Sequence, residues 1–216
     1  KEFKRLRKEA ENMSLRQRGW MTRCHPVILP SGRYVIPLYS DGYLMGLMAI
    51  SDDGGKTWHA SAPIVGLALN QPSLARKQDG TLVAYMREED DYLHRIYYSE
   101  SKDDGDTWSV AAPIELPNPN ASVDALTLAD GRWLLLYNDS ENTRDTLLLA
   151  LSDDEGHTWK WQRHLEQDAG GQFHYPTMIE GADGRVHITY TFQPSGNKGK
   201  SIKHVELDPD WVCAGK

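Results

Sequence analysis

The stretch SDDGGKTW at residues 51–58 returns twice in altered form, as SKDDGDTW at 101–108 and SDDEGHTW at 152–159. The starting positions of the three copies lie 50 and 51 residues apart. A spacing this regular marks a repeated supersecondary unit rather than unrelated surface loops. Each copy reduces to Ser-x-Asp-x-Gly-x-Thr-Trp and follows an apolar run that is typical of a strand. The octapeptide therefore predicts a turn at the same place in three successive β units.

Each octapeptide has the residues of a structural turn. Its aspartate can accept hydrogen bonds from backbone amides, its glycine permits a positive φ, and its tryptophan is large enough to anchor the hairpin by packing. These aspartates and tryptophans are Asp53, Asp103, Asp154, Trp58, Trp108 and Trp159. One fixed aspartate per turn falls short of the about 6 to 8 oxygen ligands that calcium takes. The pattern therefore predicts a structural turn without a metal.

A second repeat lies between the octapeptides. It reads QPSLARKQDGTLVAYMR from Gln71, SVDALTLADGRWLLLYN from Ser122, YPTMIEGADGRVHITYT from Tyr175, and HPVILPSGRYVIPLYS from His25. Each copy predicts a strand, a glycine turn and a second strand, as in antiparallel hairpins. Adding the two strands around the octapeptide gives four strands in about 50 residues, the size of a propeller blade. We therefore expect an all-β protein, a β-propeller of four-stranded antiparallel blades.

Composition and charge narrow the class further. The net charge of −7 argues against wholesale binding to nucleic acid, and no apolar run approaches the about 18 residues that a membrane span needs. Residues 1–19 are predicted to be a basic N-terminal arm or linker, with a short helix as the alternative. Residues 20–216 are predicted to form a partial propeller. Cys24 and Cys213 alone establish neither a disulfide nor a compartment, so secreted, periplasmic and cytoplasmic locations all stay open.

The length of the chain sets the number of blades. Three full units and a fourth without an octapeptide, built from residues 175–192 and 201–208, make about four blades. Closed propellers have about 4 to 8 blades, and an open arc would expose sheet edges. We therefore expect about four blades of a larger ring, completed by missing N-terminal blades or by another chain.

These features resemble the sialidase (neuraminidase) superfamily, and in particular the bacterial sialidase-like proteins with BNR, or Asp-box, repeats. The resemblance covers residues 20–212 and is carried by the three octapeptides, which are Asp boxes, and by TRCHPVILPSGRYVIPLYSDG (22–42), FHYPTMIEGADGRVHITYTF (173–192) and GKSIKHVELD (199–208). It implies a six-bladed propeller and an exo-glycosidase that hydrolyses a terminal sialic acid or related acidic sugar. The implied site has three arginines that hold the sugar carboxylate, a tyrosine nucleophile activated by a glutamate, and an aspartic acid.

The resemblance can be carried over residue by residue. Tyr175 matches the nucleophile, and Arg87 and Arg144 match the second and third arginines. Gln71 stands where the family has its glutamate, and an amide cannot accept the tyrosine proton as a base. Residues Glu88 and Asp124 are the candidates to replace that base, whereas the first arginine and the acid find no match.

Other interpretations of these residues stay open. Tyr175 can simply pack on an inner strand, Arg144 can be an exposed loop residue, and Arg87 can form only surface ion pairs. His25 and His174 are expected to flank the channel, as substrate-binding or acid and base groups or as structural histidines. The eight histidines have no zinc-ligand spacing, and no cofactor is predicted.

Two other functions are alternatives to the sialidase hypothesis. One is a propeller enzyme that hydrolyses another acidic saccharide or cleaves it by elimination, with His25, His174 and Tyr175 as acid and base groups. The other is a propeller that binds carbohydrate without catalysis, in which Gln71 marks the lost chemistry. All three hypotheses predict that the protein binds a glycan or an acidic sugar.

Overall fold

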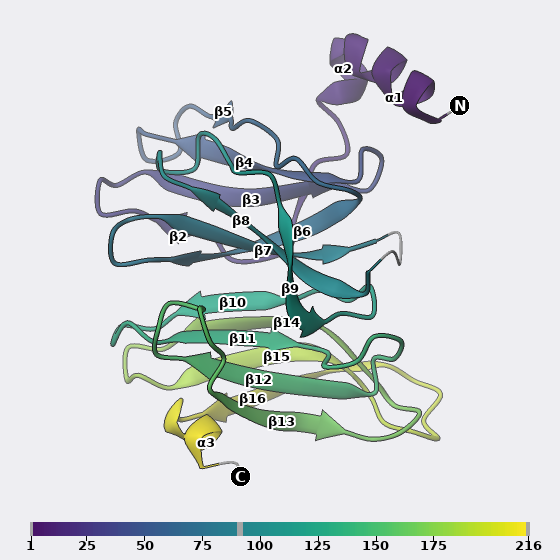
Figure 1. Ribbon diagram of the computed structural model, residues 1–216, viewed down its shortest axis with the longest axis vertical. Helices are drawn as coiled ribbons and strands as arrows, with labels where there is room; N and C mark the ends of the chain where they lie inside the picture. Colours follow the sequence, from purple (N-terminus) through teal and green to yellow (C-terminus); the bar gives the residue numbers. More distant parts are fainter. Residues whose placement is uncertain (1, 90–92, 215–216) are drawn as a thin grey trace.

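The computed structural model describes residues 2–89 and 93–214, which form four antiparallel sheets arranged as the blades of a sialidase-like β-propeller (Figure 1). Blade 1 contains β1 (Met21–Thr22), β2 (Val27–Ile28), β3 (Tyr34–Ser40), β4 (Met45–Ser51) and β5 (His59–Ala60). Blade 2 contains β6 (Leu69–Arg76), β7 (Leu82–Glu88), β8 (Arg95–Ser101) and β9 (Ala112–Pro117). Blade 3 contains β10 (Asp124–Thr127), β11 (Trp133–Tyr137), β12 (Thr146–Ser152) and β13 (Trp161–Gln167). Blade 4 contains β14 (Gln172–Glu180), β15 (Val186–Gln193) and β16 (Ser201–Leu207).

In blades 2 to 4 consecutive strands are hydrogen-bonded neighbours, as the hairpin repeats predict, whereas in blade 1 both β1 and β2 pair with β3. The predicted all-β propeller with about four blades is therefore confirmed. Each octapeptide connects the last two strands of its blade, and the described part of blade 4, which has no octapeptide, has three strands.

Short helices lie at both ends of the described chain. Within residues 1–19, the described part forms α1 (Glu2–Glu11) and α2 (Met13–Arg16), which stand off the sheets in Figure 1. The chain then enters blade 1 through Trp20, whose ring stacks on Tyr43 with the centroids 6.1 Å apart. Near the other end, α3 (Asp210–Cys213) packs against β13.

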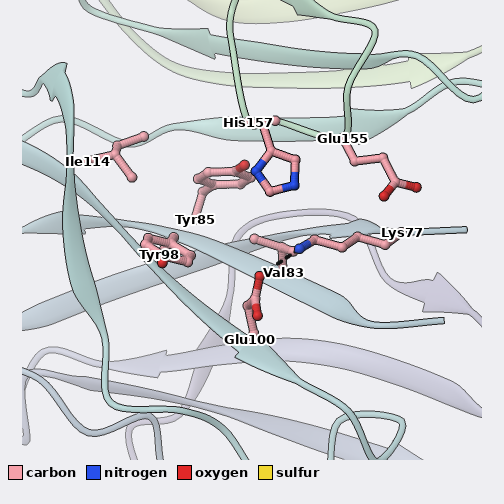
Figure 2. A pocket seen from close by; sticks show the side chains of 9 residues that line it. Lys77, Val83, Tyr85, Tyr98, Glu100, Ile114, Glu155 and His157 are labelled. Carbon is pink, nitrogen blue, oxygen red and sulfur yellow. Dashed lines mark hydrogen bonds and ion pairs between the residues drawn. The ribbon is translucent and has the colours of Figure 1, made fainter. Parts of the chain in front are cut away.

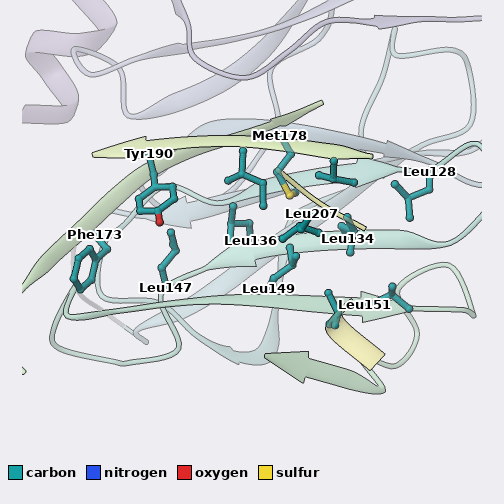
Figure 3. Close-up of a cluster of buried hydrophobic side chains, with 13 residues drawn as sticks. Leu128, Leu134, Leu136, Leu147, Leu149, Leu151, Phe173, Met178, Tyr190 and Leu207 are labelled. Atoms are coloured by element: carbon teal, nitrogen blue, oxygen red, sulfur yellow. The ribbon is translucent and has the colours of Figure 1, made fainter. Parts of the chain in front are cut away.

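Three hydrophobic clusters fill the three seams between consecutive blades. The alternation of side chains along β11 explains how one strand serves two seams. Leu134 and Leu136 face blade 4, whereas Trp133, Leu135 and Tyr137 face blade 2. All five residues of β11 are buried, which is why this strand is a continuous apolar run rather than an alternating one. Figure 3 shows the seam between blades 3 and 4, where Leu136 and Leu149 meet Met178.

The Asp boxes form compact turns through their own hydrogen bonds. In blade 3, Asp154 Oδ1 accepts the Thr158 amide at 2.8 Å and the Ser152 hydroxyl at 2.7 Å, while Oδ2 accepts the Thr158 hydroxyl at 2.7 Å. The Ser152 hydroxyl in turn accepts the Gly156 amide at 2.9 Å. These bonds favour the charged carboxylate, and the pKa of Asp154 falls to about 2, with the Thr158 amide as the largest cause. The same pattern holds around Asp53 and Asp103.

The tryptophans of the boxes differ in burial. Trp108 packs in the seam between blades 1 and 2, and Trp159 packs in the seam between blades 2 and 3. Each of these two tryptophans therefore rests on the blade that precedes its own. Trp58 is 45% exposed, because no sheet among the described residues lies before blade 1. Trp58 still contacts its own turn, where its indole Nε1 donates to the Gly55 carbonyl at 3.0 Å.

Candidate functional site

The inner strands of blades 2 and 4 are interrupted at the same place. The pairing of β6 with β7 skips from Asn70 to Ser73, and the pairing of β14 with β15 skips from His174 to Thr177. The residues left out of the ladders are Gln71 and Tyr175, each followed by a proline, and their φ angles are +56° and +55°. A non-glycine residue in this region of backbone space costs about 1 to 3 kcal/mol, and such strain gathers at functional sites.

An open cavity of about 530 Å³ lies where these interruptions meet. Its walls come from blades 1, 2 and 4. The lining side chains are Arg23, Tyr39, Asp41, Gln71, Arg87, Glu89, Tyr175 and Thr177. The fold therefore brings Gln71, Arg87 and Tyr175, which lie far apart in the sequence, to one cavity.

Tyr175 is presented to this cavity rather than packed into the core. Its side chain is 43% exposed, and its ring meets His174 edge to face with the centroids 5.0 Å apart. Within residues 2–89 and 93–214, no hydrogen bond holds its hydroxyl. The tyrosine is therefore oriented by its neighbour and by the backbone bulge, with its hydroxyl available to a ligand.

Arg87 is buried at the wall of the cavity and is paired there. Its Nη2 lies 3.4 Å from Glu89 Oε2, and Glu89 Oε2 also accepts a hydrogen bond from Asn70 Nδ2. The same amide nitrogen donates to Asp41 Oδ1 at 3.2 Å. Arg87 therefore belongs to a network of charged groups at the cavity, and not to an ion pair on the outer surface.

Gln71 is buried, and its side chain is hydrogen-bonded to blade 3. Its Oε1 accepts a hydrogen bond from the Ser122 hydroxyl, the aligned residue of blade 3. Since the carbonyl oxygen of Gln71 is occupied, its amide nitrogen is the group left for the cavity. That group donates hydrogen bonds and cannot take up a proton.

Arg144 lies behind the cavity and does not line it. It precedes β12, its Nη2 donates to the Asn120 carbonyl, and its own carbonyl accepts the Phe173 amide at 2.7 Å. Its charge nevertheless reaches His174. Burial lowers the pKa of His174 to about 4, and the charges of Arg144 and Lys200 act in the same direction. The His174 imidazole is therefore neutral near pH 7.

Asp124 lies beneath the cavity and joins three blades. Its Oδ1 accepts the Ser73 hydroxyl of blade 2 at 2.8 Å, and its Oδ2 accepts the Met178 amide of blade 4 at 2.7 Å. The ring of His25 from blade 1 approaches the same carboxylate, with Nδ1 at 3.7 Å from Oδ1. Asp124 is fully buried, and neither Asp124 nor His25 lines the cavity.

Glu88, the other candidate base, is turned away from the cavity. Its Oε2 accepts the backbone amides of Leu93 and His94 at 2.8 and 3.1 Å. The following residue, Glu89, lines the cavity instead. A one-residue change along an extended chain reverses the side to which a side chain points, which is why Glu89 and not Glu88 lines the cavity.

Five lining residues were missed by the sequence analysis. They are Arg23, Tyr39, Asp41, Glu89 and Thr177. The acidic run that follows Arg87 was a usable signal for Glu89. No local signal pointed to Arg23, which donates to two carbonyls far along the chain, that of Pro176 at 2.8 Å and that of Val123 at 2.7 Å.

A second, smaller pocket of about 210 Å³ lies at the other end of β6, against the Asp box of blade 3 (Figure 2). Lys77 and Glu100 form an ion pair at 2.7 Å on one side, and Glu155 and His157 lie on the other. Tyr85 forms part of its floor, and burial raises the pKa of this phenol above its usual range. The pocket follows the seam between blades 2 and 3 and shares no lining residue with the open cavity that Gln71, Arg87 and Tyr175 line, which is called the axial cavity below.

Neither a metal site nor a membrane helix is found in the described part of the chain. Within residues 2–89 and 93–214, no group of three or more histidine, cysteine and carboxylate side chains could hold a metal ion. None of the described helices is long and apolar enough to cross a membrane.

The four sheets, the three boxed turns and the axial cavity define the class as an Asp-box β-propeller. The chain belongs to the BNR repeat-like domain family, whose sequence profile matches residues 14–188. It is 25% identical over 181 residues to the anhydrosialidase of Macrobdella decora, a match that covers 74% of this chain and 23% of that protein.

Solved structures share the fold at low sequence identity. A protein of unknown function from Dyadobacter fermentans superposes with a TM-score of 0.74 and 22% identity, covering 88% of this chain and 54% of that one. The NanB sialidase from Streptococcus pneumoniae superposes with a TM-score of 0.71 and 21% identity, covering 87% and 30%. The chain thus spans about a quarter of the curated relative and between about a third and a half of these two structures. At this identity the likeness establishes a sialidase-like fold and leaves the activity to be argued from the site.

Proposed function

We propose that this chain carries the tyrosine and the substrate-holding wall of a sialidase-like exo-glycosidase, which hydrolyses a terminal sialic acid or a related acidic sugar from a glycan. One observation carries the proposal. Gln71, Arg87 and Tyr175 line a single cavity although they come from two blades. The family resemblance assigns the same three positions to one site, and their meeting in the fold supports that assignment.

The cavity contains one group suited to hold a sugar carboxylate and another suited to act as the nucleophile. A guanidinium is always charged, and its planar fork matches a sugar carboxylate, which suits Arg87 as one member of a clamp. Tyr175, exposed and unbonded among the described residues, is placed to attack the anomeric carbon as the nucleophile of a covalent intermediate. Tyrosine nucleophiles of this kind set sialidases apart from glycosidases that use two carboxylates.

A non-catalytic, carbohydrate-binding propeller is the second candidate. The observation that favours it is the hydrogen bond between the Ser122 hydroxyl and Gln71 Oε1, which gives the site a donor where the family has a base. Elimination by histidine chemistry has less support, because His174 is neutral and buried and His25 faces Asp124.

Release of fluorophore from a synthetic aryl α-sialoside tests the proposal. The natural-length gene product is expected to release the fluorophore, and Tyr175→Phe is expected to slow release by about 10³-fold or more, since it removes the nucleophile. Tyr43→Phe is the matched control, because Tyr43 stacks on Trp20 outside the cavity and is expected to leave the rate unchanged.

The two candidate functions give different results in this assay. Saturable binding of free sialic acid without any release of fluorophore would favour the binding propeller. Equal rates for Tyr175→Phe and the parent protein would remove the tyrosine from the mechanism and with it the proposed reaction.

A further inference from the structure

A tyrosine nucleophile needs a neighbouring group that takes its proton, and the position expected to supply it holds Gln71. The Gln71 carbonyl is occupied by Ser122, and its amide nitrogen can only donate. Glu88 Oε2 accepts hydrogen bonds from two backbone amides of the following turn. Asp124 is buried beneath the cavity, and both of its carboxylate oxygens accept hydrogen bonds. The proton acceptor must therefore be another residue if the tyrosine reacts.

Two carboxylates line the cavity within the described part of the chain, and they lie side by side. Asp41 comes from the turn after β3, and Glu89 follows the end of β7. Asn70 Nδ2 donates to both, to Asp41 Oδ1 at 3.2 Å and to Glu89 Oε2 at shorter range. Asn70 is fully buried, so it fixes the two acids at one place on the cavity wall.

Glu89 is the better held of the two. Its backbone amide donates to the Ala68 carbonyl at 2.9 Å, and its carbonyl accepts from Asn120 Nδ2 at 3.0 Å. On the side chain, Oε2 faces Arg87 and Asn70, and no hydrogen bond within residues 2–89 and 93–214 reaches Oε1. One oxygen thus anchors the carboxylate, and the other remains to accept a proton.

We propose that Glu89 is the general base for Tyr175, in place of Gln71; this inference rests on the proposed function. The two side chains line the same cavity from blades 2 and 4, and proton transfer between them would run directly or through one water. Asp41, which is exposed, stands at the rim beside the base and does not act as the base itself.

The proposed step balances without a cofactor. The bond from Tyr175 Oη to the anomeric carbon forms while the glycosidic carbon–oxygen bond breaks. The Tyr175 proton passes to Glu89, and the leaving oxygen takes a proton from water. A second water then attacks the anomeric carbon, Tyr175 leaves and recovers its proton from Glu89, and the proton released by that water neutralises the hydroxide formed in the first step.

The rate of covalent labelling by 2,3-difluorosialic acid isolates this step. Its fluoride leaves without needing a proton, so the rate reports on nucleophile and base alone. Intact mass would be followed in the natural-length protein from pH 4 to 8, with a peptide map to place the adduct on Tyr175. The parent protein is expected to label, with a rate that falls at low pH as the base becomes protonated.

Three variants separate the possible roles of the carboxylates. Glu89→Gln is expected to label about 10²-fold to 10⁴-fold more slowly and to lose the fall at low pH, since it removes the base. Asp41→Asn is expected to keep the fall in rate at low pH. Glu115→Gln, on the exposed strand β9, is the matched control and is expected to behave as the parent does.

A binding measurement distinguishes a base from a group that only orients Arg87. Affinity for free sialic acid is expected to change little in Glu89→Gln, because the general base acts on the proton of Tyr175. A loss of labelling that matches a loss of affinity at every pH would overturn the proposal and make Glu89 a positioning residue for Arg87.

The remaining outcomes are distinct. Unchanged labelling of Glu89→Gln, or loss of the low-pH fall in Asp41→Asn instead, would overturn the role of Glu89 while leaving the proposed function intact. No labelling of the parent protein at any pH would overturn both, because a base without a reacting tyrosine has no step to assist.

Discussion

Replacing Gly156 by alanine would test how closely the Asp box of blade 3 is fitted against blade 2. A Cβ at Gly156 would clash with Tyr85 Oη and would lie 3.1 Å from two ring carbons of Trp133. Non-bonded carbon atoms are at their best separation only at about 3.5 to 4.0 Å. The φ angle of Gly156 is also +80°, which residues with a Cβ rarely adopt.

Two costs therefore add in Gly156→Ala. The left-handed backbone costs alanine about 1 to 2 kcal/mol, and forcing an extra methyl into a packed seam costs about 1 to 3 kcal/mol more. We expect the free energy of unfolding to fall by about 2 to 5 kcal/mol. Gly184→Ala is the matched control, because Gly184 has a φ of +78° and no atom within 4 Å of its added Cβ. It is expected to lose only the backbone cost of about 1 to 2 kcal/mol.

Urea unfolding measures both losses, with equal m-values showing that the unfolded states are alike. Tyr85→Phe removes the oxygen that the new methyl meets first, so it is expected to relieve part of the loss in Gly156→Ala and to leave Gly184→Ala unchanged. The double-mutant cycle should give a coupling of about 1 kcal/mol or more. Equal losses at positions 156 and 184, or no coupling between Gly156→Ala and Tyr85→Phe, would refute the close fit described here.

Two further predictions concern the groups around the cavity. Asp124→Ala is expected to lower the free energy of unfolding by about 2 to 5 kcal/mol, because it leaves the Met178 amide without its acceptor and removes the shorter of the two contacts of the Ser73 hydroxyl with an acceptor. A loss in urea unfolding no larger than that of Asp183→Ala, in an exposed turn, would contradict this. His174, with its pKa lowered from 6.5 to about 4, is expected to show no NMR titration between pH 5 and 8. Because the unfolded state binds the extra proton first, stability should fall as the pH drops from about 6.5 to 4, and this part of the slope should vanish in His174→Gln.

The repeats fixed the fold because each rests on local chemistry. The Asp154 carboxylate accepts its hydrogen bonds from Ser152 and Thr158 of the same octapeptide, so the hydrogen bonds that define the turn are local. The strands around it follow from alternation and glycine turns. Which seam each strand would fill was not local: β11 is buried on both faces only because blades lie on either side of it.

Trp58 shows the limit of reasoning from the repeat. Its octapeptide matches those of Trp108 and Trp159, yet its ring is 45% exposed. The residues of the box determine the turn, whereas the burial of its tryptophan depends on the blade that precedes it.

By itself, the sequence determined the propeller class and the three boxed turns, because the octapeptide returns every 50 or 51 residues and each turn is built from its own residues. The resemblance carried by these repeats supplied the candidates Gln71, Arg87 and Tyr175. Only the tertiary structure decided which polar groups share the cavity. It brought Glu89 and Arg87 of blade 2 to one cavity with Tyr175 of blade 4, and it placed Asp124 outside the lining of that cavity. The physical reason is that side-chain direction at a strand end changes with every residue, and the axis is built from strands that lie about 50 residues apart in the chain.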